Sequence, residues 1–264
     1  MPTLHDPIAF ALGPVEVRWY ALFIVSGIVL AVGLAVWLAN QSGLDGEVLL
    51  DVAPVVVLAA IVGARLYYVM LEWDRFQNDL MGAINIRSGG LSIHGAIVVG
   101  GLTAWLLLRN REGSWWQWFD CLVPALALGQ AIGRWGNWAN QEAFGTPTDL
   151  PWAVTIDPSR RPAGYEQFST FHPTFLYESL FSFVFCTLLV LLVLHQKQFG
   201  WYRAGMAFGI YLFGYGLIRL ILESIRTDSL YIGPLPAAYW LSYALMLVGV
   251  GVILWRLGSS RHSA

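Results

Sequence analysis

Residues 19–39 read WYALFIVSGIVLAVGLAVWLA, an apolar run that contains no charged side chain. An α-helix needs about 20 consecutive apolar residues to cross the hydrocarbon core of a bilayer. The run begins after Arg18, and residues 1–10 hold no Lys or Arg, so the basic region that opens a secretory signal peptide is missing. The run therefore predicts a membrane-spanning helix.

The composition of the chain supports the same class of protein. Hydrophobic residues make up 57% of the 264 residues and charged residues only 12%, with a mean hydropathy of +0.59. Soluble domains carry about 25% charged residues, so most of this surface has no need of water. The 13 Trp and 11 Tyr favour the headgroup zone of a bilayer. A net charge of −2 gives no reason to expect nucleic acid as a partner.

Further apolar runs predict an all-α polytopic membrane protein with about seven transmembrane helices, at residues 19–39, 48–71, 91–108, 119–135, 174–194, 204–223 and 237–255. We expect one integral membrane domain over residues 1–264. Its longest connection, residues 136–173, contains five prolines and is expected to be an extracytoplasmic loop or small head, with strand character at 151–156. This connection is a candidate lid or substrate-docking element.

The distribution of positive charge does not decide the orientation. With the N-terminus outside, the inner loops carry Arg109, Arg111, Lys197, Arg203, Arg256 and Arg261, and the outer loops carry Arg18, Arg75, Arg87, Arg160, Arg161 and Arg226. The positive-inside rule compares such counts in short loops, and here they are equal. The single lysine in the inner set favours an extracytoplasmic N-terminus and a cytoplasmic C-terminus.

Ionisable residues occur inside or at the ends of the predicted spans. A charged side chain at the bilayer centre costs about 2.5–3.5 kcal/mol on insertion scales, yet this chain places Arg65, His94, Arg134, Arg219 and Glu223 there. Three arginines with few acids indicate a net cationic site for an anion, and the anion available in a membrane is a phospholipid headgroup.

The sixth span and the segment after the fourth span carry the densest polar patterns. Tyr215, Arg219 and Glu223 are four residues apart and Arg226 follows three later, so all four are expected on one helical face. Residues 133–145, GRWGNWANQEAFG, combine an arginine, two asparagines and a glutamate with glycines that let a backbone approach a ligand closely. Both patterns suit the binding of an anion by paired donors.

Each pattern also has a purely structural interpretation. Gly129–Gly133 and Gly205–Gly209 are most simply helix-packing contacts. Arg219 and Glu223 by themselves are as consistent with a structural ion pair as with function. Arg65 near a helix end can extend to the interface, and a lone histidine such as His94 is more often a satisfied core residue. Cys121 and Cys186 lie in apolar stretches without the spacing of a metal site.

Other classes of function remain as alternatives. An anion transporter or channel also buries arginines along its pathway, although the sequence shows no internal repeat. An intramembrane protease needs a nucleophile or paired acids, and the sequence contains no G-x-S-x-G run. A structural scaffold gives no reason for so many ionisable groups inside the membrane.

The ordered motifs resemble those of the prolipoprotein diacylglyceryl transferase family. Residues 133–145 match its pattern G-R-x-G-N-x-x-N-x-E-x-x-G at every fixed position. Four further elements agree in order, namely RWY at 18–20, GLSIHG at 90–95, HPTFLYE at 172–178 and GYGLIRLILE at 214–223. The resemblance runs from the first span to the sixth.

The resemblance implies an enzyme of the bacterial inner membrane with seven helices and the N-terminus outside. It implies transfer of the diacylglyceryl group of phosphatidylglycerol to the lipobox cysteine of a preprolipoprotein, with glycerol phosphate as the second product. The nucleophilic cysteine then belongs to the substrate. No metal or cofactor is suggested, and a monomer is expected.

The residues can be assigned to the two demands of this reaction, which are to hold the departing phosphate and to deprotonate the thiol. Arg134 and Arg219 suit the phosphate, and His94 is the natural base because imidazole titrates near neutral pH. In the alternative, the field of the arginines alone lowers the pKa of the thiol and His94 only binds. The remaining candidates are Asn137, Asn140 and Gly145 for the headgroup, Tyr20 and Tyr215 for orientation or proton passage, and Glu142, Glu223, Arg226, Arg65, His172 and Tyr177 in support.

The chain also departs from the family pattern. Ala96 stands where a second glycine often follows His-Gly, and Gln141 stands where glycine is common. Arg226 is followed by Thr227 and Asp228 rather than by a Gln-Pro pair. None of these changes removes an ionisable group, so they affect the fine geometry rather than the expected activity.

Overall fold

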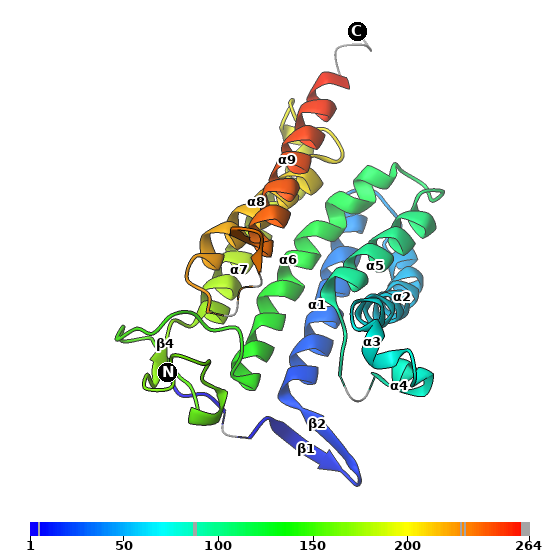
Figure 1. The fold of residues 1–264 in the computed structure, drawn as a ribbon. Coiled ribbons are helices and arrows are strands. Elements are labelled where there is room, and N and C mark those ends of the chain that lie inside the picture. The colour runs from blue at the N-terminus through cyan, green and yellow to red at the C-terminus, as the bar shows by residue number, and fades with distance from the viewer. Residues whose placement is uncertain (5, 87–88, 228, 230, 260–264) are drawn as a thin grey trace.

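The chain forms a bundle of long helices with small hairpins at one end (Figure 1). The computed structural model describes residues 1–4, 6–86, 89–227, 229 and 231–259, so Arg87, Asp228 and Arg261 lie outside the described part. The long helices are α1 (Trp19–Gln41), α2 (Glu47–Leu71), α5 (Ile93–Leu108), α6 (Trp115–Asn140), α7 (Thr174–Leu194), α8 (Met206–Glu223) and α9 (Ala237–Gly258).

Short elements connect the long helices. The two short α-helices α3 (Trp73–Phe76) and α4 (Leu80–Ile84) follow α2, and the 3-10 turns are η2 (Pro158–Arg160) and η3 (Gln196–Gln198). The strands pair in three antiparallel hairpins: β1 (Ile8–Leu12) with β2 (Val15–Arg18), β3 (Val154–Thr155) with β4 (Thr170–Phe171), and β5 (Tyr231–Ile232) with β6 (Leu235–Pro236). The strand expected at 151–156 is thus present as β3.

The length and composition of the helices define a polytopic membrane protein. Within the described residues, α1, α2, α7, α8 and α9 are each long and apolar enough to cross a membrane, and α5 is a shorter apolar helix of 16 residues. The hydrophobic side chains exposed on these helices, such as Val29, Leu58 and Leu247, are expected where lipid replaces water. The remaining expected span, at 119–135, corresponds to α6, which is the most polar of the long helices.

The long helices pack in neighbouring pairs, with α6 at the centre (Figure 1). Helix α6 lies against α1, α7 and α8, while α2 packs against α5 and α8 against α9. Glycines allow the closest approaches, because a Cβ at Gly249 of α9 would lie 2.6 Å from the carbonyl oxygen of Gly209 on α8. The packing role expected for Gly209 and Gly129 is confirmed. Gly205 is the N-cap of α8 with a φ of +98°, and it also packs closely, because a Cβ there would lie 2.7 Å from the ring of Trp116 on α6.

The boundaries of α6 differ from the prediction of a span over 119–135. The helix starts at Trp115, where Ser114 and Gln117 form a reciprocal capping box, and continues to Asn140. The backbone therefore stays helical through the first residues of the segment expected to be a loop, and the loop itself covers residues 141–173. We call residues 141–173 the head.

The head has a small hydrophobic core of its own. Phe144, Val154, Ile156 and Phe171 are buried together with Phe175 at the start of α7. The head and the hairpin β1–β2 lie at the same end of the bundle, where the described N-terminal residues also lie, and α9 ends at the opposite end (Figure 1). We call the end with the head the site end.

Candidate functional site

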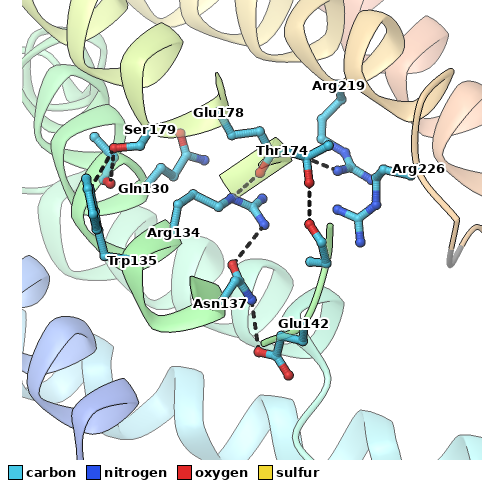
Figure 2. A network of polar contacts seen from close by, with 12 residues as sticks. Gln130, Arg134, Trp135, Asn137, Glu142, Thr174, Glu178, Ser179, Arg219 and Arg226 are labelled. Carbon is cyan, nitrogen blue, oxygen red and sulfur yellow. Dashed lines mark hydrogen bonds and ion pairs between the residues drawn. The ribbon is translucent and has the colours of Figure 1, made fainter. Parts of the chain in front are cut away.

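The polar residues of the site meet where α6 ends, α7 begins and α8 ends, at the site end of the bundle. Arg134 lies on the last turns of α6, and Figure 2 shows its guanidinium between Glu178 and Asn137. Glu178 belongs to the second turn of α7, and Arg219 belongs to α8. Three helices thus bring together side chains that are far apart in the sequence.

Glu178 joins the two arginines. Its Oε2 forms an ion pair with Nε of Arg134, and its Oε1 accepts a hydrogen bond of 2.9 Å from Nη1 of Arg219. The residue is only 4% exposed. A buried carboxylate needs such partners, because the free energy of removing it from water is large. Glu178 therefore fixes the separation and the orientation of both guanidiniums.

The sequence placed Glu142 and Glu223, but not Glu178, among the supporting residues of the site. Glu178 is nevertheless the only residue of the predicted span 174–194 that is charged at neutral pH. An acid inside a membrane helix is by default a functional candidate. The start of the span predicted at 174–194, which is α7, therefore supplies the acid that joins the two arginines.

Glu223 is the second acid of the site. It is 5% exposed, and its Oε2 accepts a hydrogen bond of 2.6 Å from Nη2 of Arg219. The same oxygen lies 3.9 Å from Nε of Arg226. Glu223 and Arg219 thus form an ion pair between residues four apart on α8. Arg226, however, follows the end of α8 and pairs with Gly145 in an isolated β-bridge, so the helical face ends at Glu223.

Glu142 binds the two asparagines rather than an arginine. Its Oε1 accepts hydrogen bonds of 2.9 Å from Nδ2 of Asn137 and 3.4 Å from Nδ2 of Asn140. Because α6 continues to Asn140, the two asparagines lie on one helical face, three residues apart. The Oδ1 of Asn137 in turn accepts a 3.4 Å hydrogen bond from Nη1 of Arg134. Glu142 therefore reaches Arg134 only through Asn137.

The backbone around Glu142 is unusual. Gln141 and Ala143 have φ values of +53° and +54°, in the left-handed region that favours glycine. Glycine adopts this conformation without strain, which gives a physical reason for the glycine that is common at position 141 in the family pattern. The Gln141 side chain offsets the strain through Nε2, which donates to Oδ2 of Asp157 at 2.7 Å, and through Oε1, which accepts from the Asp157 backbone at 2.9 Å.

Gly145, His172 and Tyr177 form the connection between head, α7 and α8. A Cβ at Gly145 would lie 2.8 Å from the carbonyl oxygen of Ile225 and 2.9 Å from Cβ of His172, so this position has no room for a side chain. The Tyr177 hydroxyl lies 3.2 Å from Nδ1 of His172 and accepts a 2.9 Å hydrogen bond from Trp152. These residues hold the head against the bundle beside Glu178.

The two tyrosines proposed for orientation lie at different distances from the arginines. The ring of Tyr20, on α1, packs against Gly136 of α6, and its hydroxyl is in electrostatic range of Glu142 and Arg134. Tyr215 lies one turn before Arg219 on α8 and stacks on Tyr211 with ring centres 6.0 Å apart. Tyr20 is therefore placed beside the site, and Tyr215 supports the face of α8 that carries Arg219.

Arg65 has a structural environment away from the other arginines. Its guanidinium donates to the backbone carbonyls of Gly82, Ala83, Gly89 and Gly90 at 2.7–2.8 Å. It also lies over the rings of Tyr68 and Phe76. Arg65 thus anchors the connection between α2 and α5, and every one of these contacts is to that connection or to α2.

His94 lies on the first turn of α5, exposed, with its ring centre 6.1 Å from that of Tyr67 on α2. It has no contact with Arg134, Glu178 or Arg219 among the interactions of the described residues. The helix start that carries it is at the site end of the bundle (Figure 1). A catalytic base must reach the proton in the complex with substrate, and geometry without substrate does not exclude it.

The local charges balance, in contrast to the cationic site expected from the sequence. The three arginines of the site, Arg134, Arg219 and Arg226, are matched in number by three glutamates. Glu178 and Glu223 form ion pairs with these arginines, and Glu142 is linked to Arg134 through Asn137. Arg65 belongs to another part of the fold. The side chains of Arg134 and Arg219 remain 25% and 18% exposed. Guanidiniums that are oriented by buried acids and still accessible can present paired donors to phosphate oxygens.

Fold and site together define a polytopic membrane protein with a buried arginine–glutamate network at one end of its bundle. The family model described as prolipoprotein diacylglyceryl transferase matches residues 7–255. The chain is 44% identical over 260 residues to the phosphatidylglycerol–prolipoprotein diacylglyceryl transferase of Synechococcus elongatus, covering 98% of this chain and 90% of that protein.

Relatives of the same description occur in other organisms. The protein from Finegoldia magna is 40% identical over 93% of both chains, and the protein from Acaryochloris marina is 44% identical over 95% of this chain and 89% of its own. The chain belongs to the prolipoprotein diacylglyceryl transferase family, as the ordered motifs predicted.

Proposed function

We infer that this protein transfers the diacylglyceryl group of phosphatidylglycerol to the thiol of the lipobox cysteine of a preprolipoprotein. The observation that carries the inference is the pair Arg134 and Arg219, held by the buried Glu178 in a chain that matches the family almost from end to end. In the reaction the cysteine sulfur bonds to the glyceryl carbon as the bond from that carbon to the phosphate oxygen breaks. The oxygen keeps the electron pair, and glycerol phosphate leaves.

We propose that Arg134 and Arg219 hold the phosphate as it departs. Both guanidiniums keep donors that Glu178 does not use, and Nη2 of Arg134 has no partner among the described residues. Charge that develops on the leaving oxygens is stabilised most strongly by donors oriented in advance in a site of low dielectric constant. Asn137 and Asn140 hold Glu142 and complete the headgroup side of the site.

The thiol proton needs an acceptor, and two proposals stand. In the first, His94 takes the proton after substrate has brought the cysteine to the start of α5. In the second, the nearby guanidiniums lower the pKa of the thiol and His94 serves only in binding. Tyr20, beside Arg134 and Glu142, is placed to orient the substrate in either case.

We propose that all seven long helices cross the membrane, with the site end outside. Helix α6 has 26 residues and extends about 39 Å, more than the roughly 30 Å of a hydrocarbon core. Helix α5 has 16 residues and extends about 24 Å. Seven crossings would put the start of α1 and the end of α9 on opposite sides of the membrane. In Figure 1 these two helix ends lie at opposite ends of the bundle. The membrane is then the bacterial cytoplasmic membrane, with the C-terminus in the cytoplasm.

One chain supplies every residue of the site, so we propose that the monomer is active. The partners are phosphatidylglycerol and the lipobox peptide, which carries the nucleophile. Cys121 and Cys186 are buried and free, and neither touches the arginine network, so they take no part in the reaction.

Mass spectrometry of a lipobox peptide incubated with the purified protein and phosphatidylglycerol tests the proposed function. A mass gain equal to one diacylglyceryl group, with release of glycerol phosphate, is the expected result. An anion transporter, the alternative class, would leave the peptide unmodified while moving anions across proteoliposomes. An unmodified peptide with intact phosphatidylglycerol would therefore overturn the proposal.

A further inference from the structure

A pocket lies beside the arginine network at the point where the head meets the end of α6. Its volume is about 290 Å³. It is lined by Gln141, Glu142, Ala143, Phe144, Arg160, Pro162 and Thr227. Glu142 belongs to both the pocket and the asparagine pair on α6, so the pocket opens next to the residues proposed to hold the headgroup.

Two opposite charges line the pocket. Glu142 uses only Oε1 to bind Asn137 and Asn140, and Oε2 has no partner in the described part of the chain. Arg160 is exposed, and among the described residues its guanidinium has no partner either. A bare phosphate is attracted by one wall and repelled by the other. An extended peptide offers N–H donors and C=O acceptors together, which matches a carboxylate facing a guanidinium.

The pocket is built rather than incidental. Its edge contains the two left-handed residues Gln141 and Ala143, a strained backbone that persists only where the surroundings hold it in place. The side chain of Gln141 is bound at both ends to Asp157, three residues before Arg160. The Thr227 hydroxyl donates to the carbonyl of Phe144 at 3.4 Å and closes the other side.

We propose that this pocket binds the acceptor substrate's polypeptide just after the lipobox cysteine. This proposal rests on the proposed function and adds a subsite to it. The apolar part of a signal peptide ends at the cleavage region, so the cysteine lies at the outer membrane surface and the chain that follows it enters water. The head lies on that side of the proposed membrane, and its pocket shares Glu142 with the network that reaches Arg134 through Asn137.

The two charged walls give the subsite a preference. An acidic side chain in the first residues after the cysteine gains attraction from Arg160, whereas a basic side chain is repelled. An exposed charge pair changes affinity by about two- to five-fold. Reversing the charge at Arg160 would repel an acidic side chain and attract a basic one. The preference for an acidic over a basic acceptor peptide therefore changes by the product of both effects.

The test compares two lipobox peptides that differ only in having Asp or Lys at the second position after the cysteine. The wild-type enzyme is expected to give the higher kcat/KM with the Asp peptide, through a lower KM. Arg160→Glu is expected to change the ratio of the two kcat/KM values by at least about five-fold, in favour of the Lys peptide. The KM for phosphatidylglycerol is expected to stay constant.

Arg75→Glu is the matched control, because Arg75 is an exposed residue of α3 at the same end of the bundle and does not line the pocket. It applies the same charge reversal and is expected to leave the ratio unchanged. An unchanged ratio in Arg160→Glu, or an equal change in Arg75→Glu, overturns the subsite while the proposed function stands. Absence of any lipidated product with the wild-type enzyme would instead overturn the proposed function.

Discussion

Glu178 determines how two arginines from different helices face the same point. Its two oxygens bind Arg134 and Arg219 separately, so loss of its charge removes the link that sets the two guanidiniums relative to each other. Glu178→Gln keeps the size of the side chain but directs an amide N–H group at one guanidinium. A misplacement of about 1 Å at a reacting centre can reduce the rate about a hundred-fold, and we expect a fall in kcat of that order.

The measurement for Glu178→Gln is steady-state lipidation together with thermal unfolding. Glu112→Gln, an exposed change in the connection between α5 and α6, is the control. Removing the side chain altogether in Glu178→Ala leaves Arg134 without a carboxylate partner, while Arg219 keeps Glu223. Breaking this buried pair is expected to cost about 3–5 kcal/mol of stability. A Gln variant with the kcat of the wild type would contradict the positioning role.

Arg134→Lys keeps the charge but loses the forked geometry of the guanidinium. A lysine cannot bind Glu178 through one nitrogen while presenting paired donors to a phosphate. We expect loss of most of the activity, about a hundred-fold in kcat, with little change in peptide KM. Arg111→Lys, on an exposed connection, serves as control, and full activity of Arg134→Lys in a purified assay argues against the role.

His94→Asn separates the two proposals for the thiol proton. If His94 is the base, the variant loses activity and the rise of rate with pH shifts upward, toward the ordinary thiol pKa of about 8.5. If the arginines alone activate the thiol, the pH–rate profile keeps its shape. His195→Asn, an exposed histidine at the end of α7, is the control. An unchanged rate and profile in His94→Asn would remove it as base.

At the scale of single residues, the sequence indicates contacts within one helix but not contacts between helices. Arg219 and Glu223 share one face of α8, because spacing on a helix specifies which residues lie together. Arg134 reaches them only through Glu178, where α6, α7 and α8 pack. The role of Glu178 in joining the arginines, and the position of Arg65 outside the site, depend on how different helices pack. Such contacts have no periodicity within one segment, so the local sequence does not contain them.

Among the elements, the pair α8–α9 depends on close approach at glycine. Gly249→Leu would place its Cβ 2.6 Å from the Gly209 carbonyl oxygen. Overpacking of this kind costs about 1–3 kcal/mol, so we expect the melting temperature in detergent to fall by roughly 2–10 °C. Gly251→Leu on the same helix, where a Cβ meets nothing within 4 Å, should melt with the wild type. Equal melting of both variants contradicts the packing role.

The elements show a similar limit of prediction. Within the described residues, each predicted apolar run overlaps one long helix, because length and hydropathy are properties of each segment. The continuation of α6 to Asn140 was missed, since Gly136 to Asn140 are polar enough to read as a loop. Neighbouring side chains, including the ring of Tyr20 against Gly136, support that last turn.

For the whole molecule, the proposed orientation predicts opposite accessibilities for two exposed connections. Asp149→Cys lies in the head and should react with a membrane-impermeant thiol reagent added outside spheroplasts. Glu112→Cys lies between α5 and α6, at the other end of the bundle, and should react only after permeabilisation. Both native cysteines are buried, which keeps the background low. The reverse pattern would contradict the orientation, which the six-to-six count of basic residues left open.

The neutral balance of the site has a consequence for discrimination between lipids and soluble anions. Glu178 already neutralises part of the charge on both guanidiniums, so they attract an incoming anion less strongly than unpaired arginines would. We therefore expect free phosphate and released glycerol phosphate, which bring only charge, to be weak inhibitors. Phosphatidylglycerol is instead held in the bilayer by its acyl chains, beside the exposed apolar helices, so its concentration at the site is far higher than that of a soluble anion. Selection of the donor thus depends on the lipid tails as much as on the headgroup.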